Sequence, residues 1–531
     1  MPDLERHLAG RTLVLLSNRE PYEHVAPPAD RGGPPTVRRP PGGLVSALDP
    51  TMQRTHGTWV AWGSGSGDRD AVGDDDRLMV PPEDPSYTLR RVWLDEGDVE
   101  GYYLGFANQA LWPLCHMLLQ HYDLRAEHWQ RYVAVNARFA DAVADEALRA
   151  RRDPVIWVQD YHFAVAPAQI RARLAAHGRR AFLHQFWHIP FPPPDILRLL
   201  SADVASAVVG GMLGNDLLEF HTERHAMNFM DCVAHFVPGA ELRREHRRLT
   251  VDGRDVHVGV FPISIDVERY EELARSPRAA RAAAELRRRH AGPGRTLGVS
   301  VDRIDYTKGI PERLRALDQL WEACPDLRGC LTFLVVATPS RSELGSYQAL
   351  EEEVLSSVAA INARWATADW TPIVLRHENV GAEELAAIYR AGDLCLVSSL
   401  QDGMNLVAKE FLACNVDEQG VLVLSRFAGA AEEIDGAVLI NPFNVDAFVA
   451  GLRDAIAMPE DERRERMQGM RERLHDATIF DWMAGILARV DELAPPSARP
   501  ERRLGRPGHS GCPGIAPADL PVGDAAPLAG P

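Results

Sequence analysis

Short apolar runs alternate with longer helical segments along almost the whole of this 531-residue chain. Most of the runs are continuous in Val, Leu and Ile, which is typical of strands buried on both faces. The expected strands are Thr12–Ser17, Val155–Val158, Ala181–Phe186, Thr296–Val301, Leu331–Ala337, Pro372–Leu375, Leu394–Val397 and Val421–Leu424. Helical segments between them, such as Trp129–Arg149 and Pro311–Ala323, predict an α/β fold with parallel sheets and right-handed crossovers.

Two interruptions of this alternation suggest how the chain is divided. Pro27–Gly43, rich in Pro, Gly and Arg, is expected to be a loop, and a linker is expected near Ile265–Glu271. Because the chain is too long for one core, we predict two doubly wound domains, residues 1–265 and 266–478. Ligands in such folds bind at the carboxyl ends of the strands, here in a cleft between the domains. Residues 495–531 are rich in Pro, Gly and Ala and are expected to be disordered.

Composition narrows the classes of partner. The formal net charge of −17 argues against nucleic acid or an anionic membrane, because both attract positive surfaces. The seven Cys include no C-x-x-C pair, so neither a zinc site nor a disulfide framework is expected. The first apolar run, Leu13–Leu16, is too short for a signal peptide or a membrane span. We therefore expect a cytoplasmic enzyme, and the sequence leaves a homo-oligomer open.

The segment Val301–Ile310 carries the strongest chemical signal. Arg303 and Lys308 lie between an expected strand and a helix that begins near Pro311. A helix N-terminus favours anions, so a guanidinium and an ammonium beside it predict a diphosphate site. Lys308 is one of two lysines among 58 Lys and Arg, which suggests that a compact ammonium is needed there. The alternative is an exposed loop with two solvated cations.

The second signal is the segment Leu400–Glu410, which follows another expected strand. Asp402 is placed at the carboxyl end of that strand, where a carboxylate can accept hydrogen bonds from sugar hydroxyls. The helix expected from Leu406 onward puts Glu410 two turns further on, within reach of both hydroxyls of a ribose. The alternative is a helix-capping Asp with a solvated Glu. For Lys409, next to Glu410, a side chain that points away from the ligand stays open as an alternative, so its role is less clear than that of Lys308.

Other polar and aromatic groups follow strands or loops of the N-terminal half. They are Arg19 in Ser-Asn-Arg, the pair Gly42-Gly43, the aromatic stretch Tyr102–Trp112, Asp160 in Gln-Asp-Tyr-His, and His188 before a proline run. Paired glycines allow close approach of the backbone to a phosphate or a sugar, and aromatic rings stack on sugars. Core packing is an equal alternative for the aromatic stretch, and a structural role is an alternative for His188.

In this order, these segments resemble the trehalose-6-phosphate synthase family of retaining glycosyltransferases, over about Leu13–Leu493. The resemblance implies two facing Rossmann-like domains (a GT-B fold) with an inter-domain cleft, and a final helix, within residues 479–494, that crosses back to the first domain. It implies transfer of glucose from a nucleotide-glucose to glucose 6-phosphate, with no cofactor. The partners are then a nucleotide-glucose donor and a sugar-phosphate acceptor.

The resemblance also implies site residues. For the donor they are Gly42, Gly43, Arg303, Lys308, Val380, Asp402, Gly403, Met404, Asn405, Leu406, Val407, Ala408, Lys409 and Glu410. For the acceptor they are Arg19, Trp62, Tyr103, Trp112, Asp160 and Arg341. The catalytic set is Asp160, His188, Arg303, Lys308 and Asp402, with no metal, because no Asp-x-Asp pair stands at a strand end. The cations replace a metal, and the leaving phosphate helps to deprotonate the acceptor.

Some positions depart from the family pattern. Gln159 stands where a His is common, Gln401 stands where an Arg is common, and the loop after Arg19 is long. Arg19–Tyr22 and Thr58–Trp62 also resemble glucosylglycerol-phosphate synthases, so glycerol 3-phosphate stays open as the acceptor. A non-catalytic regulatory subunit is a third possibility. The base of the donor nucleotide, uracil, adenine or guanine, is open because backbone groups read it.

Overall fold

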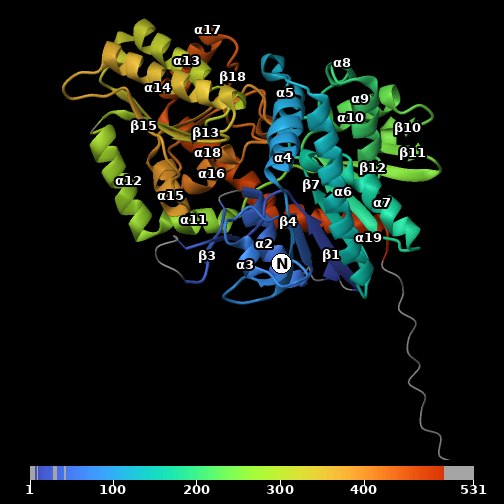
Figure 1. Ribbon diagram of the computed structural model, residues 1–531. Helices are drawn as coiled ribbons and strands as arrows, with labels where there is room; N and C mark the ends of the chain where they lie inside the picture. Colours follow the sequence, from blue (N-terminus) through green and yellow to red (C-terminus); the bar gives the residue numbers. More distant parts are fainter. Residues whose placement is uncertain (1–5, 9, 28–32, 41–42, 293, 496–531) are drawn as a thin grey trace, which may run out of the picture. The chain divides into compact units, whose positions relative to one another are not determined.

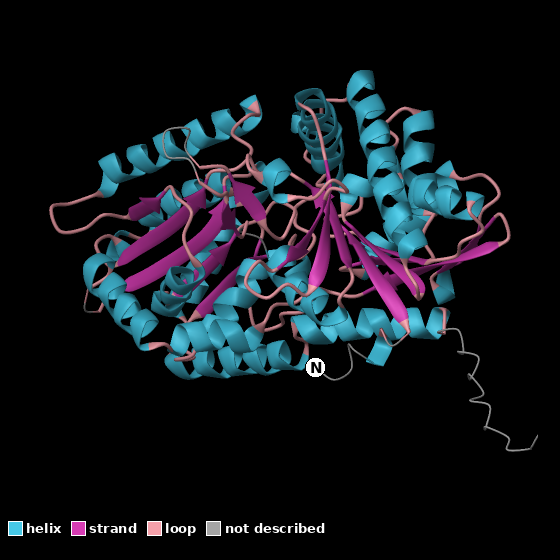
Figure 2. Ribbon diagram, turned by 60° about the horizontal axis from the view of Figure 1, so that its bottom comes forward, coloured by secondary structure: helices cyan, strands magenta, loops and turns pink. Residues whose placement is uncertain are grey.

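The computed structural model describes residues 6–8, 10–27, 33–40, 43–292 and 294–495, which belong to one compact unit. Two separate sheets organise this unit, one in each half of the chain, and helices cover them (Figures 1 and 2). The expected α/β architecture with two domains is therefore confirmed. The expected tail lies outside the described residues apart from residue 495, and the exact domain boundaries stay a prediction.

The first sheet has ten strands in the order β10-β11-β12-β9-β8-β7-β1-β4-β6-β5. Its central strands from β12 to β6 are parallel, and antiparallel strands complete both edges. The bounds are β1 Arg11–Leu16, β4 Thr58–Trp62, β5 Arg77–Val80, β6 Tyr87–Val92, β7 Asp153–Gln159, β8 Phe182–Phe186, β9 Leu217–Phe220, β10 Glu241–Arg243, β11 Arg248–Val251 and β12 Arg254–Val260. The sheet is thus mixed at its edges, where the sequence alone predicted parallel pairing.

The second sheet has six parallel strands in the order β15-β14-β13-β16-β17-β18. Its strands are β13 Thr296–Arg303, β14 Leu331–Thr338, β15 Ile373–Arg376, β16 Leu394–Val397, β17 Val421–Ser425 and β18 Val438–Ile440. This is the doubly wound order in which the strand sequence reverses between the first and fourth strands. Ligands are expected beside the carboxyl ends of β13 and β16, where that reversal occurs.

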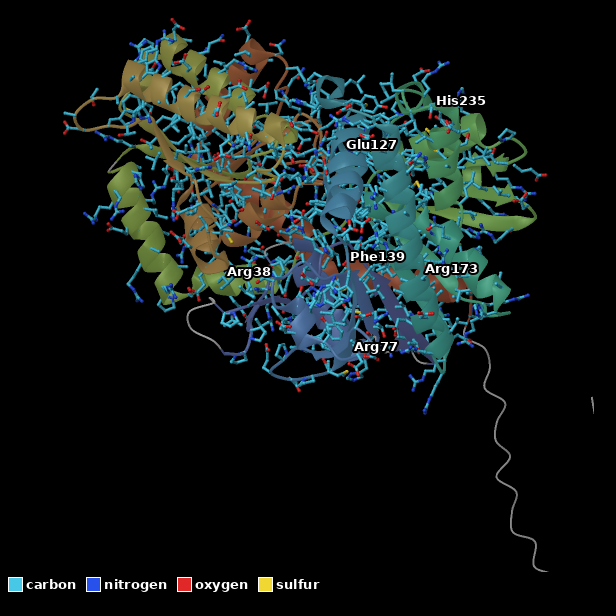
Figure 3. All side chains as sticks on the ribbon, in the orientation of Figure 1. Arg38, Arg77, Glu127, Phe139, Arg173 and His235 are labelled. Atoms are coloured by element: carbon cyan, nitrogen blue, oxygen red, sulfur yellow. The ribbon has the colours of Figure 1, made fainter. Side chains whose placement is uncertain are left out.

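The helices alternate with these strands, as the sequence predicts. In the N-terminal half they are α2 Gly43–Thr55, α3 Asp68–Ala71, α4 Glu96–Asp98, α5 Trp112–Cys115, α6 Ala126–Arg149, α7 Ala166–Ala176, α8 Pro194–Leu197, α9 Ala202–Met212 and α10 Glu223–Phe236. In the C-terminal half they are α11 Val267–Arg275, α12 Pro277–His290, α13 Ile310–Ala323, α14 Gly345–Trp365, α15 Ala382–Ala391, α16 Leu406–Cys414, α17 Val445–Ala457, α18 Glu460–Asp476 and α19 Ile479–Leu493. Phe139 on α6 (Figure 3) is fully buried and packs edge-on against Phe163 at 4.9 Å between ring centroids.

Two expectations about irregular segments are wrong. Thr36–Arg38, inside the expected loop, forms strand β3, which pairs in antiparallel fashion with β2, Glu23–Val25. The proline-rich composition hid this hairpin, because its Pro residues flank the strand and do not interrupt it. The expected linker is also shorter than predicted, since α11 begins at Val267 with Asp266 as its N-cap.

The irregular segment after β12 is held by the last part of the chain. Its carbonyl groups at Phe261, Ile263 and Ile265 accept hydrogen bonds from the indole of Trp482, from Lys409 Nζ and from the amide of Ile479, at 3.1, 2.8 and 3.0 Å. Helix α19 then packs on the first sheet. Its Trp482 ring lies 5.6 Å from that of Trp157 on β7, and 4.9 Å from that of Phe186 on β8.

The aromatic stretch before α5 folds as a π-helix, Val99–Leu111. The π-helix is rare, and its usual form, a single-turn bulge, is frequently found at functional sites. The wide turn separates two adjacent tyrosines. Tyr102 is fully buried and donates to Asn18 Oδ1 at 2.8 Å, whereas Tyr103 faces the main cavity. Core packing therefore applies to Tyr102, whereas a binding role stays a prediction for Tyr103, which lines the cavity.

Candidate active site

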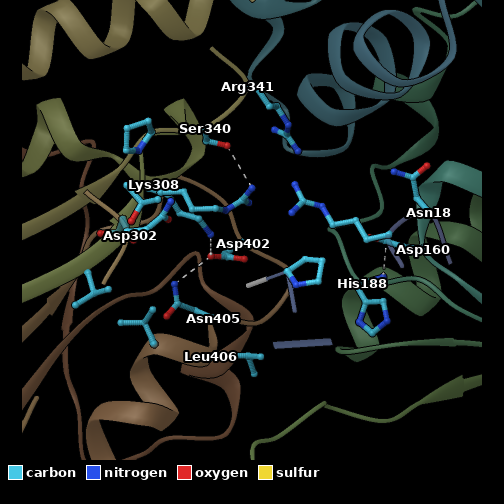
Figure 4. Close-up of a pocket in the computed structure, with 18 of the residues that line it drawn as sticks. Asn18, Asp160, His188, Asp302, Lys308, Ser340, Arg341, Asp402, Asn405 and Leu406 are labelled. Carbon is cyan, nitrogen blue, oxygen red and sulfur yellow. Dashed lines mark hydrogen bonds and ion pairs between the residues drawn. The ribbon is translucent and has the colours of Figure 1, made fainter. Parts of the chain in front are cut away.

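A cavity of about 960 Å³ lies between the carboxyl ends of the two sheets (Figure 4). In the first sheet the strands whose carboxyl ends border it include β1, β4, β7, β8 and β9, and in the second they include β13, β14 and β16. The expected site residues that line it are Arg19, Trp62, Tyr103, Asp160, His188, Arg303, Lys308, Arg341, Val380, Asp402, Met404, Asn405, Leu406, Val407 and Glu410. Most of the residues singled out from the sequence are thus brought together in one space.

The cation-bearing turn after β13 has a specific backbone shape. Arg303 ends the strand, and Lys308 ends a short 3-10 helix, Tyr306–Lys308. Gly309 then adopts a left-handed φ of 62°, and a Cβ on it would lie 2.3 Å from the carbonyl oxygen of Ser398. Only glycine fits there, since both φ and the close approach exclude a side chain. The turn is therefore fixed against the strand that precedes Asp402.

Lys308 and Asp402 form an ion pair at the floor of the cavity, 2.6 Å from Nζ to Oδ2. Asn405 Nδ2 and Ser399 Oγ donate to the same carboxylate at 3.1 and 3.2 Å. Burial opposes ionisation of Asp402, but the charge and hydrogen bond of Lys308 outweigh it, so the pKa of Asp402 is lowered. The pair thus places an ammonium group and an ionised carboxylate side by side at the cavity wall.

Helix α16 points its N-terminus at the cavity. Asn405 is its N-cap, with φ of 110°, and its side chain accepts from the amide of Ala408 at 3.1 Å. Five residues after Asn405, Glu410 accepts a hydrogen bond on each carboxylate oxygen, from the hydroxyls of Tyr270 and Tyr389, both at 2.9 Å. Burial raises the pKa of Glu410 although both tyrosines lower it. The carboxylate is thus fixed in orientation where it lines the cavity.

A second group of cations, Arg19 and Arg341, adjoins Arg303 around Tyr103. Tyr103 faces Arg341, Arg19 and Arg303; burial alone would raise its pKa, but these guanidinium charges outweigh burial and lower it. Arg341 Nε is buried and has no hydrogen-bond partner within the described residues. Excess positive charge around a phenol, with an unused donor, is the environment that a phosphate ligand would complete.

Asp160 and His188 follow adjacent strands, β7 and β8. Asp160 has a left-handed φ of 68°, a strained conformation for a residue other than glycine. Its Oδ1 accepts from the amide of His188 at 3.0 Å, and burial raises its pKa to about 7. Burial lowers the pKa of His188 to about 3, so the ring is neutral, and Nε2 lies 2.8 Å from Gln159 Oε1. Because an amide oxygen only accepts, this contact places the proton on Nε2.

Some expected site residues do not present their side chains to the cavity. Trp112 packs under Arg341, whose guanidinium carbon is 4.3 Å from the ring centroid. Gly403 packs on the backbone of His188, where a Cβ would lie 2.0 Å from the carbonyl oxygen. Ala408 is fully buried, and Lys409 points to Ile263 and to Glu433, with Nζ 2.7 Å from the Glu433 carboxylate. The Lys409 side chain therefore points away from the cavity, and its expected place among the donor residues stays a prediction. Gly42 lies outside the described residues, and Gly43 begins α2.

Several cavity residues were not found from the sequence. They include Asn18, Glu20, Glu23, Arg38, His221, Asp302 and Ser340. Asn18 and Glu20 flank Arg19, so the position next to a strand end was an available signal. Glu23 and Arg38 form a bidentate ion pair across the β2–β3 hairpin, with the shortest contact 2.8 Å, and Arg38 stays 65% exposed. Recognition of the hairpin would have placed them together.

Neither a metal-binding cluster nor a membrane-spanning helix is present among the described residues. No group of three or more His, Cys, Asp or Glu side chains in this part of the chain is arranged to hold a metal ion. No helix within the same residues has the length and apolar character needed to cross a membrane.

Comparison with known proteins adds to this geometry. The profile of "Glycosyltransferase family 20" matches residues 11–492. A trehalose-6-phosphate synthase of Mycolicibacterium paratuberculosis is 36% identical over 489 residues, which cover 91% of this chain and 96% of the relative. A bifunctional trehalose-6-phosphate synthase/phosphatase of Thermoproteus tenax is 34% identical over 499 residues, and the match spans 92% of this chain but 64% of that longer protein.

Solved structures are similar over nearly the same range. An E. coli structure bound with UDP-2-fluoro glucose has 31% identity and a TM-score of 0.77, covering 91% of this chain and 99% of that one. A UDP-forming alpha,alpha-trehalose-phosphate synthase of Burkholderia xenovorans, in complex with glucose-6-phosphate, has 31% identity and a TM-score of 0.76, covering 90% and 100%. The two-domain arrangement of the chain is therefore one that solved enzymes share.

Proposed function

Because this chain belongs to glycosyltransferase family 20, we propose that it transfers glucose from UDP-glucose to glucose 6-phosphate, giving α,α-trehalose 6-phosphate. Membership confirms the resemblance inferred from the sequence motifs. The similar structures contain a UDP-glucose analogue in one case and glucose-6-phosphate in another. The C-terminal domain would bind the donor and the N-terminal domain would contribute most of the acceptor site.

One observation carries the proposal: two adjoining groups of cations line a single cavity. Arg303 and Lys308 stand at the turn after β13, beside the N-terminus of α16, which suits a diphosphate. Arg19 and Arg341 face Tyr103 elsewhere in the cavity, which suits a single phosphate group. A donor with a diphosphate and an acceptor with a phosphate would use both groups.

The arrangement supports transfer with retention. Lys308 and Arg303 would stabilise the charge that develops on the leaving diphosphate, a contribution worth about a hundredfold to a thousandfold in turnover for one such group. Asp160 and neutral His188 would orient sugar hydroxyls. The leaving phosphate oxygen would take the proton of the acceptor hydroxyl on the same face, through a short-lived oxocarbenium-like state. No residue of the cavity is assigned as a covalent nucleophile.

The test is release of nucleoside diphosphate by the purified protein with UDP-glucose and either glucose 6-phosphate or glycerol 3-phosphate, in the presence of EDTA. Release only with glucose 6-phosphate, with a non-reducing phosphorylated disaccharide as product, would support the proposal. Release only with glycerol 3-phosphate would overturn the acceptor assignment while keeping the donor site. ADP-glucose and GDP-glucose in the same assay would define the base. A cytoplasmic location and a homo-oligomer stay predictions, testable by fractionation and light scattering.

A further inference from the structure

Asp305 occupies an unusual position between the two groups of cations. It is fully buried, lies between Arg303 and Lys308 in sequence, and is not among the residues that line the cavity. Each of its carboxylate oxygens serves a different element. This residue therefore joins the donor side and the acceptor side of the cavity without touching either ligand.

The Oδ1 atom shapes the donor turn. It accepts from the amide of Thr307 at 3.0 Å and from the hydroxyl of the same residue at 2.9 Å. The carbonyl of Asp305 also accepts from the amide of Lys308 at 2.9 Å. These bonds close the short helix that ends with Lys308, so this half of the side chain sets where the donor cation stands.

The Oδ2 atom holds Arg341 on the acceptor side, and it also lies 4.0 Å from Nη2 of Arg303 on the donor side. It accepts from Arg341 Nη1 at 3.1 Å and from the hydroxyl of Tyr347 at 3.3 Å, and Arg341 also bonds to that hydroxyl. Arg341 has a left-handed φ of 48°, a conformation that costs energy unless its surroundings impose it. With Nη1 anchored in this way, its unpartnered Nε is left as a donor for a ligand.

We infer that Asp305 is a positioning residue. It orients Arg341 for the phosphate of the acceptor and fixes the position of Arg341 relative to the turn that carries Lys308. This inference rests on the proposed function, because it takes the sugar phosphate as the ligand of Arg341. The low pKa of Asp305, about 2, agrees with it: burial would raise the value, but Arg341, Arg303 and Lys308 outweigh burial. The carboxylate thus stays ionised at any working pH.

The substitution Asp305→Asn distinguishes the effect of Asp305 on Arg341 from its effect on the turn that carries Lys308. The donors of Thr307 select the amide oxygen, so the amide NH₂ is turned toward Arg341 and repels it. We expect the KM for glucose 6-phosphate to rise about tenfold to a hundredfold, the range for a lost charge-assisted hydrogen bond. The KM for UDP-glucose is expected to stay within about twofold. Asp305→Ala, which removes both oxygens, should raise both KM values.

A second, milder variant guards against misfolding. Tyr347→Phe keeps the carboxylate of Asp305 but removes the hydroxyl shared with Arg341, so we expect a severalfold rise in the KM for glucose 6-phosphate alone. Tyr122→Phe is the matched control, because its hydroxyl is exposed and donates at 3.1 Å to the carbonyl of Leu199, far along the chain from these residues. Melting temperatures of all variants show whether each protein is folded.

The outcomes are separable. Equal changes of both KM values in folded Asp305→Asn, or no change in either, would overturn the inference. If the wild type transfers glucose to no sugar phosphate, the proposed function fails. Calorimetric binding of glucose 6-phosphate in the presence of UDP then still tests the inference, since the Asn variant should bind it at least tenfold more weakly than the wild type. Equal binding by the two proteins, or no binding by either, would refute it.

Discussion

Replacement of Lys308 by methionine tests the electrostatic basis of the site. The side chain keeps its length but loses the ammonium that lies 2.6 Å from Asp402 and would face the departing diphosphate. The kcat should fall about a hundredfold to a thousandfold, as for other preorganised groups that stabilise developing charge. Steady-state release of UDP, with both substrates saturating, measures this fall.

The same substitution has a cost in stability that can be worked out from burial. Lys308 and Asp402 each expose 15% of their side chains, so the cost lies between that of a surface pair, at most about 1 kcal/mol, and that of a buried pair, about 3–5 kcal/mol. We expect the free energy of unfolding to fall by about 2–3 kcal/mol. Arg278→Met is the control, since its exposed pair with Glu383 should contribute little.

The pH dependence and a double variant complete the test. In the wild type the pKa of Asp402 is lowered, so its contribution to stability is present above about pH 4 and is lost as pH falls below that. Without Lys308, burial raises that pKa, so the stability gap should widen from pH 4.5 to pH 7.5. Adding Asp402→Asn should restore stability but not kcat. A single variant with kcat within threefold of wild type, or a double variant that regains kcat, would refute the reasoning.

Three further predictions concern residues that contact His188. Gly403→Ala should abolish turnover, because the added Cβ would lie 2.0 Å from the carbonyl oxygen of His188. Titration with UDP should show that the variant still binds this ligand and is therefore folded. The Asp160→Asn variant should become more stable relative to wild type as pH rises from about 4 to about 7. In the wild type, burial raises the pKa of Asp160 to about 7, so the folded state keeps a proton that the unfolded state loses, and stability falls over that range. Urea unfolding at several pH values measures the difference. Gln159→Glu should raise the pKa of His188 from about 3 and so move the acidic limb of the kcat/KM profile to higher pH; an unmoved limb would contradict the assignment.

Local patterns were sufficient to predict the strand-to-turn positions of the site. Arg303, Lys308 and Asp402 follow continuous apolar runs, and parallel strands bring their carboxyl ends to one edge, so their meeting could be predicted. Orientation around a helix was harder. Lys409 and Glu410 are adjacent and therefore about 100° apart on α16, so only one of them can face the cavity. The position of Glu410 in the sequence suggested that Glu410 faces the cavity. The structure agrees, because the Lys409 side chain is buried against the carbonyl group of Ile263.

Contacts between distant segments could not be predicted. The carboxylate of Asp305 meets Arg341 across 36 residues, and nothing in the local sequence indicates that pairing. The β2–β3 hairpin was hidden because proline content was read as a loop, although Thr36–Arg38 lies between the prolines. The π-helix could not be predicted either, because no rule of hydrophobic periodicity indicates that Tyr102 is buried while Tyr103 faces the cavity.

The packing of α19 on the first sheet has a consequence for synthesis on the ribosome. Trp482 covers Trp157 and Phe186, and Asp491 pairs with Arg11 on β1 at 2.8 Å, so the core of the first half is completed by the last helix. Helix α19 starts more than 200 residues after β12 ends. At about 5–20 residues per second, the nascent first half waits roughly 10–40 s with this apolar strip uncovered. Chaperones that bind exposed aromatic surface would find their target in that interval.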